Sequence, residues 1–155
     1  MRSKINAKIL RNIPSTFTDT RIDDQIVFIE FDDGTVIPLF DPNIISKTDM
    51  VNTIKKIAII SNFSKIEKIN DKHQKGVESK YKSADTEIIA IKEPICFYGD
   101  IVSIDKNHGS VFVDLGIGIL ESTICYDQKD SIQDYKIGDF VKIFGGRIDL
   151  KNTFD

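Results

Sequence analysis

Two hairpin-like stretches, 84 residues apart, constrain what this chain can fold into more than any other feature. In residues 111–120 (VFVDLGIGIL), apolar side chains alternate with Phe112 and Asp114. Alternation with a period of two is typical of a β-strand that buries one of its faces. Gly116 and Gly118 then tolerate the positive φ angles of a tight reversal, after which apolar residues resume. The stretch therefore predicts two strands joined by a short turn.

Residues 27–36 (VFIEFDDGTV) repeat this layout. After a shift of 84 positions, three of the ten residues are identical and four more are similar in type. Asp33-Gly34 is a strong signal for a hairpin turn, and each copy places a Phe, Phe28 or Phe112, on the face opposite the apolar one. The repeat predicts an all-β fold of two small β-barrels in tandem.

The predicted barrels occupy residues 1–63 and 96–155, and a polar, Lys-containing connector joins them over 64–95. Between 64 and 85 the connector holds six Lys and four acidic residues, with little apolar content after Ile69. This composition favours a solvated linker. The alternative is a flexible basic arm that contacts phosphates.

Local signals subdivide the first barrel. Residues 4–13 predict a strand that ends at Pro14, because proline removes a backbone hydrogen-bond donor. The polar stretch 15–24 predicts a loop, and the β-branched run 54–63 predicts a long strand. Between them, residues 44–52 predict a helical turn.

Composition limits the class of protein. Hydrophobic residues make up 41% of the 155 positions, which is enough for a buried core, yet the apolar runs fall far short of the ~18 residues of a membrane span. No apolar segment follows the basic residues Arg2 and Lys4, so a secretory signal is not predicted. We therefore expect a cytoplasmic protein.

The net charge is slightly negative, and the charged residues are unevenly distributed along the chain. The net charge is −3, and residues 96–155 hold six basic and ten acidic side chains. Such a balance gives no general attraction for nucleic acid, so binding of that kind requires a local basic patch.

The two cysteines do not form a recognisable site. Cys96 and Cys125 lack the C-x-x-C spacing of a zinc site and are too few for a disulfide framework. Cys125 is predicted to be a small buried hydrophobe rather than a reactive thiol. A disulfide between the two cysteines remains an open alternative.

Catalytic motifs are absent from the sequence. His73 and His108 do not stand in the spacing of a Ser-His-Asp or Cys-His nucleophile, and no phosphate-binding glycine loop is present. The pairs Asp23-Asp24 and Asp32-Asp33 suit turns better than a hard cation. The sequence predicts a protein that is not an enzyme and that has no cofactor and no metal site.

The second half resembles a known family. Its predicted elements follow the order strand, turn, Phe-Val-Asp-Leu-Gly hairpin, polar segment and further strand. The residues on which the resemblance rests are 99–102 (GDIV), Gly109, 112–118 (FVDLGIG) and 136–141 (KIGDFV). This third of the chain resembles the OB-fold family, in particular the small RNA-binding barrels of the ribosomal-protein type. Where the family's final strand should begin, the chain soon reaches Asp155, which implies a truncated barrel or one completed by a partner.

The resemblance implies that the aromatic residue matching Phe112 faces outward and stacks on a base, and Phe28 is its counterpart in the first copy. The alternative is that Phe112 packs under a loop or against the other barrel. The leading functional hypothesis is non-catalytic binding of single-stranded nucleic acid, RNA rather than DNA. The basic residues expected to contact phosphates are Lys8, Arg11, Lys55, Lys56, Lys106, Lys142 and Arg147.

A second hypothesis uses the same features differently. In a protein-interaction or assembly module, the Phe side chains are buried at an interface and the short last strand pairs with another chain, which includes the possibility of a homo-oligomer. Salt dependence distinguishes the two hypotheses, because phosphate contacts weaken steeply with salt and an apolar interface does not.

Overall fold

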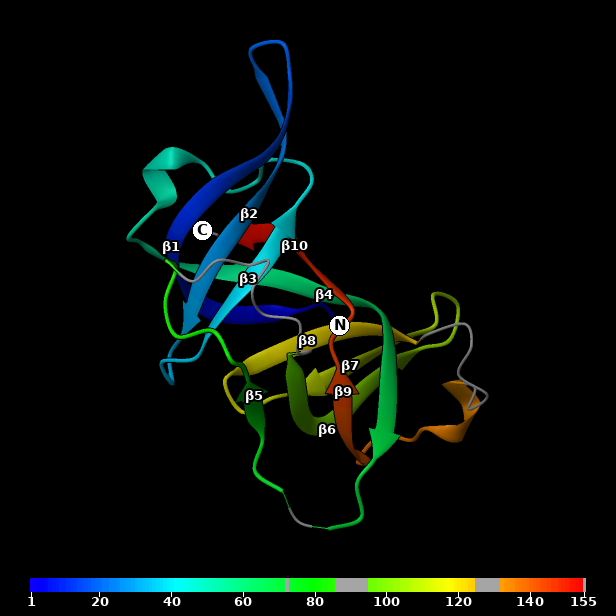
Figure 1. Ribbon diagram of the computed structural model, residues 1–155. Coiled ribbons are helices and arrows are strands. Elements are labelled where there is room, and N and C mark those ends of the chain that lie inside the picture. The colour runs from blue at the N-terminus through cyan, green and yellow to red at the C-terminus, as the bar shows by residue number, and fades with distance from the viewer. Residues whose placement is uncertain (72, 86–94, 125–131, 155) are drawn as a thin grey trace.

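The computed structural model describes residues 1–71, 73–85, 95–124 and 132–154, and they form the predicted all-β protein (Figure 1). Two short 3-10 helices, η1 (Thr48–Met50) and η3 (Ile132–Asp134), interrupt the strands, and η1 lies within the predicted helical turn. None of the helices among these residues has the length and apolar character needed to cross a membrane. The strands are β1 (Lys4–Thr18), β2 (Arg21–Phe31), β3 (Val36–Asp41), β4 (Ile54–Lys68), β5 (Gly76–Glu78), β6 (Cys96–Asp105), β7 (Ser110–Asp114), β8 (Gly118–Ile124), β9 (Phe140–Phe144) and β10 (Arg147–Phe154).

Strands β1, β2, β3 and β10 and the first half of β4 form a closed circuit of paired strands, which we call the N-terminal ring. β1, β2 and β3 form an antiparallel meander, and Gly34 at φ 88° makes the predicted turn between β2 and β3. β4 returns antiparallel to β1. β10 closes the circuit, since it pairs antiparallel with β4 and parallel with β3 through Asp149 and Phe40.

Strands β6, β7, β8 and β9 and the second half of β4 form a similar circuit, the C-terminal ring. β6, β7 and β8 are again an antiparallel meander, and β9 pairs antiparallel with β6. The second half of β4 pairs antiparallel with β9 and parallel with β8. The sequence predicted a second barrel that is either truncated or completed by a partner. In the structure, β4 of the same chain supplies the strand that closes this ring.

The two rings exchange their last strands. From the Lys68–Val141 pair to the Ile59–Leu150 pair, β4 runs antiparallel to β9 and then β10 in one unbroken register. The 84-residue shift of the sequence repeat maps β4 onto β9 and β10 in turn, so the crossing is nearly symmetric. Figure 1 shows β4 passing from the upper ring into the lower one.

The predicted boundary at residue 63 falls inside β4. Phe63 adopts a φ of 52° at the point where β4 leaves one ring for the other, and β4 then continues to Lys68. The prediction of a solvated linker over 64–85 is therefore wrong for residues 65–68, which form β-ladder pairs with β9. It is also wrong for Tyr81, whose side chain is buried against β2. The remainder of the predicted connector at 86–94 lies outside the described residues.

The strands β1 and β2 continue beyond the ring as a two-stranded arm, which projects at the top of Figure 1. The prediction that the first strand ends at Pro14 and that a loop follows is wrong, because β1 runs on to Thr18. Pro14 sits opposite Gln25 next to a register shift, where β1 has only β2 as a neighbour and a missing N–H donor is tolerated. At the arm's tip, the paired residues Phe17 and Ile22 are 62% and 36% exposed.

Each ring encloses apolar side chains from alternate positions of its strands. In β1, for example, Ile5, Ala7 and Ile9 are buried, whereas Lys4 and Asn6, which precede Ile5 and Ala7, are exposed. Cys96 is a buried free thiol, and burial raises its pKa. Cys125, the other cysteine, lies outside the described part of the chain.

Candidate functional site

Phe28 does not occupy a surface that a base can reach. Its side chain points out of the N-terminal ring as predicted, but it is 0% exposed. The ring of Tyr81 covers it edge-on, with 6.0 Å between centroids and an interplanar angle of 66°. Ser79 anchors this covering segment by donating a hydrogen bond to the backbone carbonyl of Val36, at 2.7 Å. The expected stacking role of Phe28 is therefore incompatible with this arrangement.

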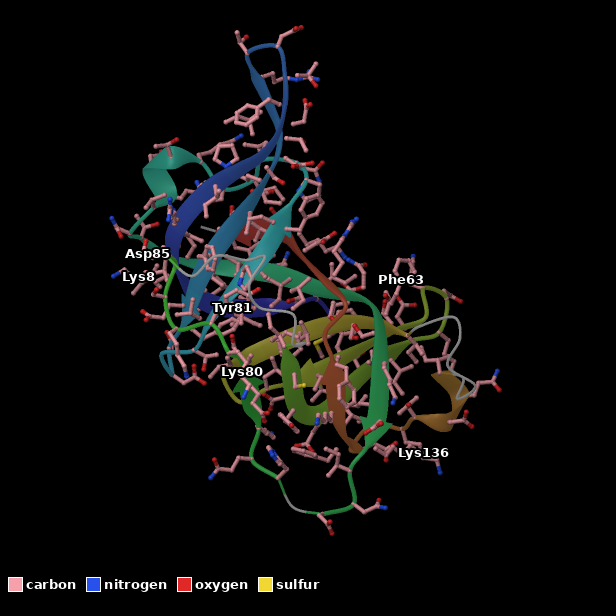
Figure 2. The ribbon with its side chains drawn as sticks, viewed as in Figure 1. Lys8, Phe63, Lys80, Tyr81, Asp85 and Lys136 are labelled. Carbon is pink, nitrogen blue, oxygen red and sulfur yellow. The ribbon has the colours of Figure 1, made fainter. Side chains whose placement is uncertain are left out.

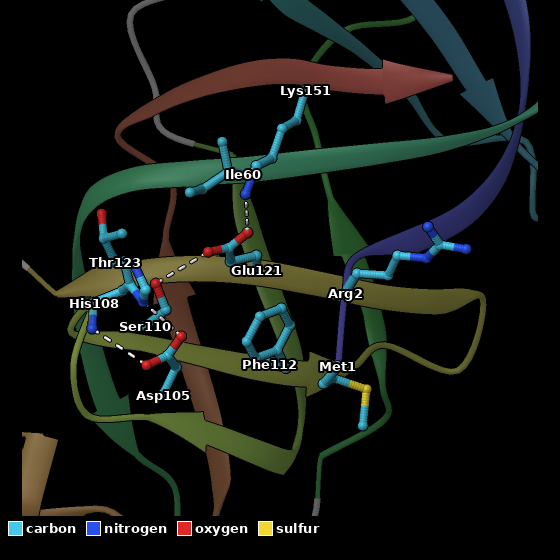
Figure 3. Close-up of a pocket in the computed structure, with 10 residues that line it drawn as sticks. All are labelled: Met1, Arg2, Ile60, Asp105, His108, Ser110, Phe112, Glu121, Thr123 and Lys151. Atoms are coloured by element: carbon cyan, nitrogen blue, oxygen red, sulfur yellow. Dashed lines mark hydrogen bonds and ion pairs between the residues drawn. The ribbon is translucent and has the colours of Figure 1, made fainter. Parts of the chain in front are cut away.

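Phe112 lies at a pocket of about 400 Å³ on the outer face of β7 and β8 (Figure 3). The side chain is 6% exposed, and it shares the sheet face with its cross-strand neighbour Glu121. Ile60 of β4 and Lys151 of β10 line the pocket from above in Figure 3, and Met1 lies below the ring. Of the two Phe residues singled out in the sequence, only Phe112 borders an open space.

Charged groups of both signs surround that space. Glu121 is almost fully buried, and its carboxylate accepts hydrogen bonds from Lys151 Nζ at 2.9 Å and from Ser110 Oγ at 3.1 Å. At the other end of the pocket, Asp105 Oδ2 lies 2.8 Å from His108 Nδ1. This hydrogen bond lowers the pKa of the Asp105 carboxyl, which therefore carries its charge at neutral pH.

A basic face covers the outside of β1, β4 and β10. Lys4, Asn6 and Lys8 alternate with buried residues along β1, so their side chains point away from the core. Lys56 lies directly opposite Asn6 in the ladder, and Lys55 borders the same surface. Among the described residues, none of these lysines has an ion-pair partner. We define the basic face as Arg2, Lys4, Lys8, Lys55 and Lys56.

Apolar groups interrupt the basic face. Phe154 pairs with Lys56, and the exposed Ile54 pairs with Lys8, so both lie among the lysines. A shallow pocket of about 290 Å³ opens beside them. The guanidinium of Arg2 stands 4.5 Å above the Phe154 ring. Because Arg2 also lines the pocket at Phe112, the basic face and that pocket form one continuous surface.

The other predicted phosphate contacts do not belong to this surface. Lys142 lies on the outer face of β9, with its Nζ 4.5 Å from the Phe144 ring centroid, and a hydrogen bond with Tyr98 raises the pKa of the lysine. Arg147 is already engaged, because its guanidinium donates hydrogen bonds of 2.7–3.2 Å to the Asp149 carboxylate. The same contact raises the pKa of Arg147.

Two further candidates fall in different surroundings. Lys106 is exposed in the turn between β6 and β7, next to the Asp105 end of the pocket. Arg11 pairs with Asp85 at 3.4 Å at the base of the arm. The structure thus brings together Lys8, Lys55 and Lys56, and Arg2 connects them to the pocket at Phe112, which has Lys106 at its other end. Phe28 lies close to Lys8 on the paired strand β2 but is covered, and Lys142 and Arg147 do not line either pocket.

The sequence hypothesis missed Arg2, Lys4 and Phe154. A signal for the basic residues was present, because Arg2, Lys4, Asn6 and Lys8 recur with the period of two that places side chains on one strand face. Phe154 had no comparable signal, since its position depends on the pairing of β10 with β4 rather than with β9.

The described residues contain no group of three or more His, Cys, Asp or Glu side chains that could hold a metal ion. This chain matches no protein-family model, no curated protein and no solved structure. What the surface does therefore has to follow from its geometry and charge.

Proposed function

We propose that this protein binds single-stranded nucleic acid, RNA rather than DNA, without catalysing a reaction. The observation that supports it best is the basic face, where Lys4, Lys8 and Lys56 point outward from the adjacent strands β1 and β4. Arg2 and Lys55 border these lysines, and Glu30, which lies opposite Lys8 in β2, is an acid at the margin of the face. In a chain of net charge −3, such a patch attracts polyanions locally although the whole molecule does not. Its cations would neutralise phosphates and release their counterions.

The pockets beside the basic face favour a single strand over a duplex. Phe154 and Phe112 lie at the two pockets, and an aromatic ring offers each unpaired base a stacking partner worth roughly 1–3 kcal/mol. Bases in a duplex are stacked on one another and cannot enter such pockets. A backbone that follows the lysines of β1 and β4 past Arg2 would bring bases to both rings.

The fold is consistent with a relationship of both rings to the OB family. Each ring combines a three-stranded antiparallel meander, an antiparallel fourth strand and a fifth strand that runs parallel to the third. This is the pairing scheme of a five-stranded Greek-key barrel, an architecture that often binds oligonucleotides. The exchange of the fifth strands between the rings is a departure from two consecutive barrels.

The test is binding of fluorescently labelled oligo-U and oligo-dT, measured by anisotropy at several salt concentrations. We expect oligo-U to bind more tightly than oligo-dT, and both to weaken as salt increases. The double variant Lys8→Gln/Lys56→Gln should bind oligo-U about tenfold more weakly. Because each lost phosphate contact removes ~0.7 from the slope of log affinity against log salt, the slope should fall by about 1.4.

The matched control is Lys47→Gln/Lys136→Gln, which removes the same charge from exposed sites outside the basic face. Lys136 lies far from Lys8 in Figure 2. Equal losses in both double variants would show that only net charge matters and would contradict a defined site. Absence of binding by the unmodified protein at low salt would refute the proposed function itself.

One observation favours protein assembly as a second candidate. Phe17 and Ile22 pair across the tip of the projecting arm and are exposed, whereas two-stranded ribbons are marginally stable without a partner. If two copies of the chain associate through this tip, sedimentation velocity should show a concentration-dependent dimer. The variant Phe17→Ser/Ile22→Ser should then remain monomeric, and a monomer at every concentration of the unmodified protein would exclude this contact.

A further inference from the structure

The two rings treat their outward Phe residues differently. Phe28 and Phe112 occupy corresponding positions of the sequence repeat, each in the central strand of a three-stranded meander. Over Phe28, the chain supplies an aromatic ring of its own, Tyr81, whose side chain is 8% exposed in that place. Over Phe112 the structure has a pocket of about 400 Å³ instead. The N-terminal ring therefore shows how an aromatic group covers an outward Phe, and the C-terminal ring has a pocket in which such a group could lie.

We propose that the pocket at Phe112 binds a guanine base of the single strand, an assignment that rests on the proposed function. A planar base would cover the Phe112 ring as the Tyr81 side chain covers Phe28. The pocket's volume exceeds that of a single side-chain ring, so a purine fits into it and would contact the part of the Phe112 ring that borders the pocket. Base–aromatic contacts of this kind tolerate any base, so the identity of the base must come from polar groups.

The Glu121 carboxylate is the hydrogen-bond acceptor nearest to Phe112 in the β7–β8 ladder. Glu121 lies beside the ring on the same sheet face, and Ser110 and Lys151 hold its carboxylate in place. Each carboxylate oxygen has two acceptor sites, so each can accept a further N–H after its bond within the protein. Figure 3 shows the Glu121 carboxyl group above the Phe112 ring, with its oxygens directed toward Lys151 and Ser110.

A carboxylate of this kind distinguishes guanine from uracil. Guanine carries two adjacent donors on one edge, N1–H and the N2 amine, and together they match the two oxygens of one carboxylate. Uracil places its single N–H between two carbonyl oxygens, which an anionic group repels. The buried charge of Glu121 would therefore favour guanine and disfavour uracil at this one position of the strand.

The nearby cations suit the phosphates on either side of such a base. Arg2 lines the pocket and also stands over Phe154, so it lies between the pocket and the lysines of the basic face. Lys151 approaches the pocket from β10. A base inserted at Phe112 would thus keep its backbone on the cationic side of the pocket.

The experiment compares three labelled pentanucleotides by anisotropy at one low salt concentration: U5, the same strand with a central guanosine, and the same strand with a central inosine. Guanosine should increase the affinity about tenfold over U5, in line with a bidentate contact. Inosine, which lacks the N2 amine, should recover only part of that gain. Glu121→Gln should abolish the preference for guanosine, because it lowers the affinity for the guanosine strand and does not lower the affinity for U5.

The control is Glu67→Gln, which removes an acid from the outer face of β4 near Lys65, away from the pocket. It should retain the preference for guanosine. Equal binding of the three strands by the unmodified protein would overturn the guanine assignment and leave the proposed function in place. A preference that survives in Glu121→Gln would also overturn it, whereas failure of all three strands to bind would refute the proposed function.

Discussion

Removal of β10 should unfold the N-terminal ring, although β10 follows the C-terminal ring in the sequence. A chain that ends at Gly146 loses the strand that, among the described residues, joins β3 to β4. It also loses Ile148 and Leu150, which are 6% and 1% exposed. Burial of two such side chains contributes about 3–6 kcal/mol, which is comparable with the 5–15 kcal/mol of a typical domain before the lost strand pairing is counted.

Amide hydrogen exchange would show which ring is affected. The shortened chain should lose protection throughout β1, β2 and β3, whereas β6, β7 and β8 should keep part of theirs because β4 and β9 still close their ring. Two independent consecutive barrels would behave in the opposite way. The variant Asn152→Ser, which alters an exposed position of the same strand, should leave the protection of both rings nearly unchanged.

Phe28→Ala should lower the free energy of unfolding by about 3–5 kcal/mol. The Phe28 side chain is fully buried between the N-terminal ring and Tyr81, so truncation leaves a cavity that the surrounding strands cannot fill. Phe112→Ala should cost clearly less, because water can enter the open pocket and no sealed cavity forms. Chemical denaturation followed by circular dichroism measures both values.

The role of Tyr81 can be checked in the same experiment. A double-mutant cycle of Phe28→Ala and Tyr81→Ala should give a coupling energy of about 0.5–1.5 kcal/mol, the usual range for an edge-to-face aromatic pair. If Phe28→Ala and Phe112→Ala cost the same and the cycle shows no coupling, Tyr81 does not cover Phe28 in solution.

Local sequence signals were sufficient for the strands and turns of the meanders. The alternation around Val27 and Val111 and the glycines after each run specify which face is buried, since a strand's two faces follow directly from its period. The all-β class is confirmed on this basis, and so is the turn at Gly34. Pro14 misled the prediction, because its effect depends on whether the neighbouring edge is paired.

Pairing between distant strands was not predictable in the same way. Ile66 in β4 and Ile148 in β10 both lie in ordinary runs of alternating apolar and polar residues. Such a pattern predicts a strand but does not indicate which ring the strand will close. The burial of Phe28 depends on Tyr81, a residue of the segment that composition alone predicted to be solvated. The basic face likewise arises only when β1, β4 and β10 are adjacent.

The exchange of last strands also fixes an order of events during protein synthesis. β1 to β4 emerge from the ribosome first, yet the strand that seals their ring emerges last. Translation of the ~80 residues between Lys68 and Arg147 takes about 4–16 s at 5–20 residues per second, against microseconds for a hairpin to form. Throughout that interval the edge of β3 in the nascent chain has no strand to pair with. The half of the molecule made first is therefore the half completed last.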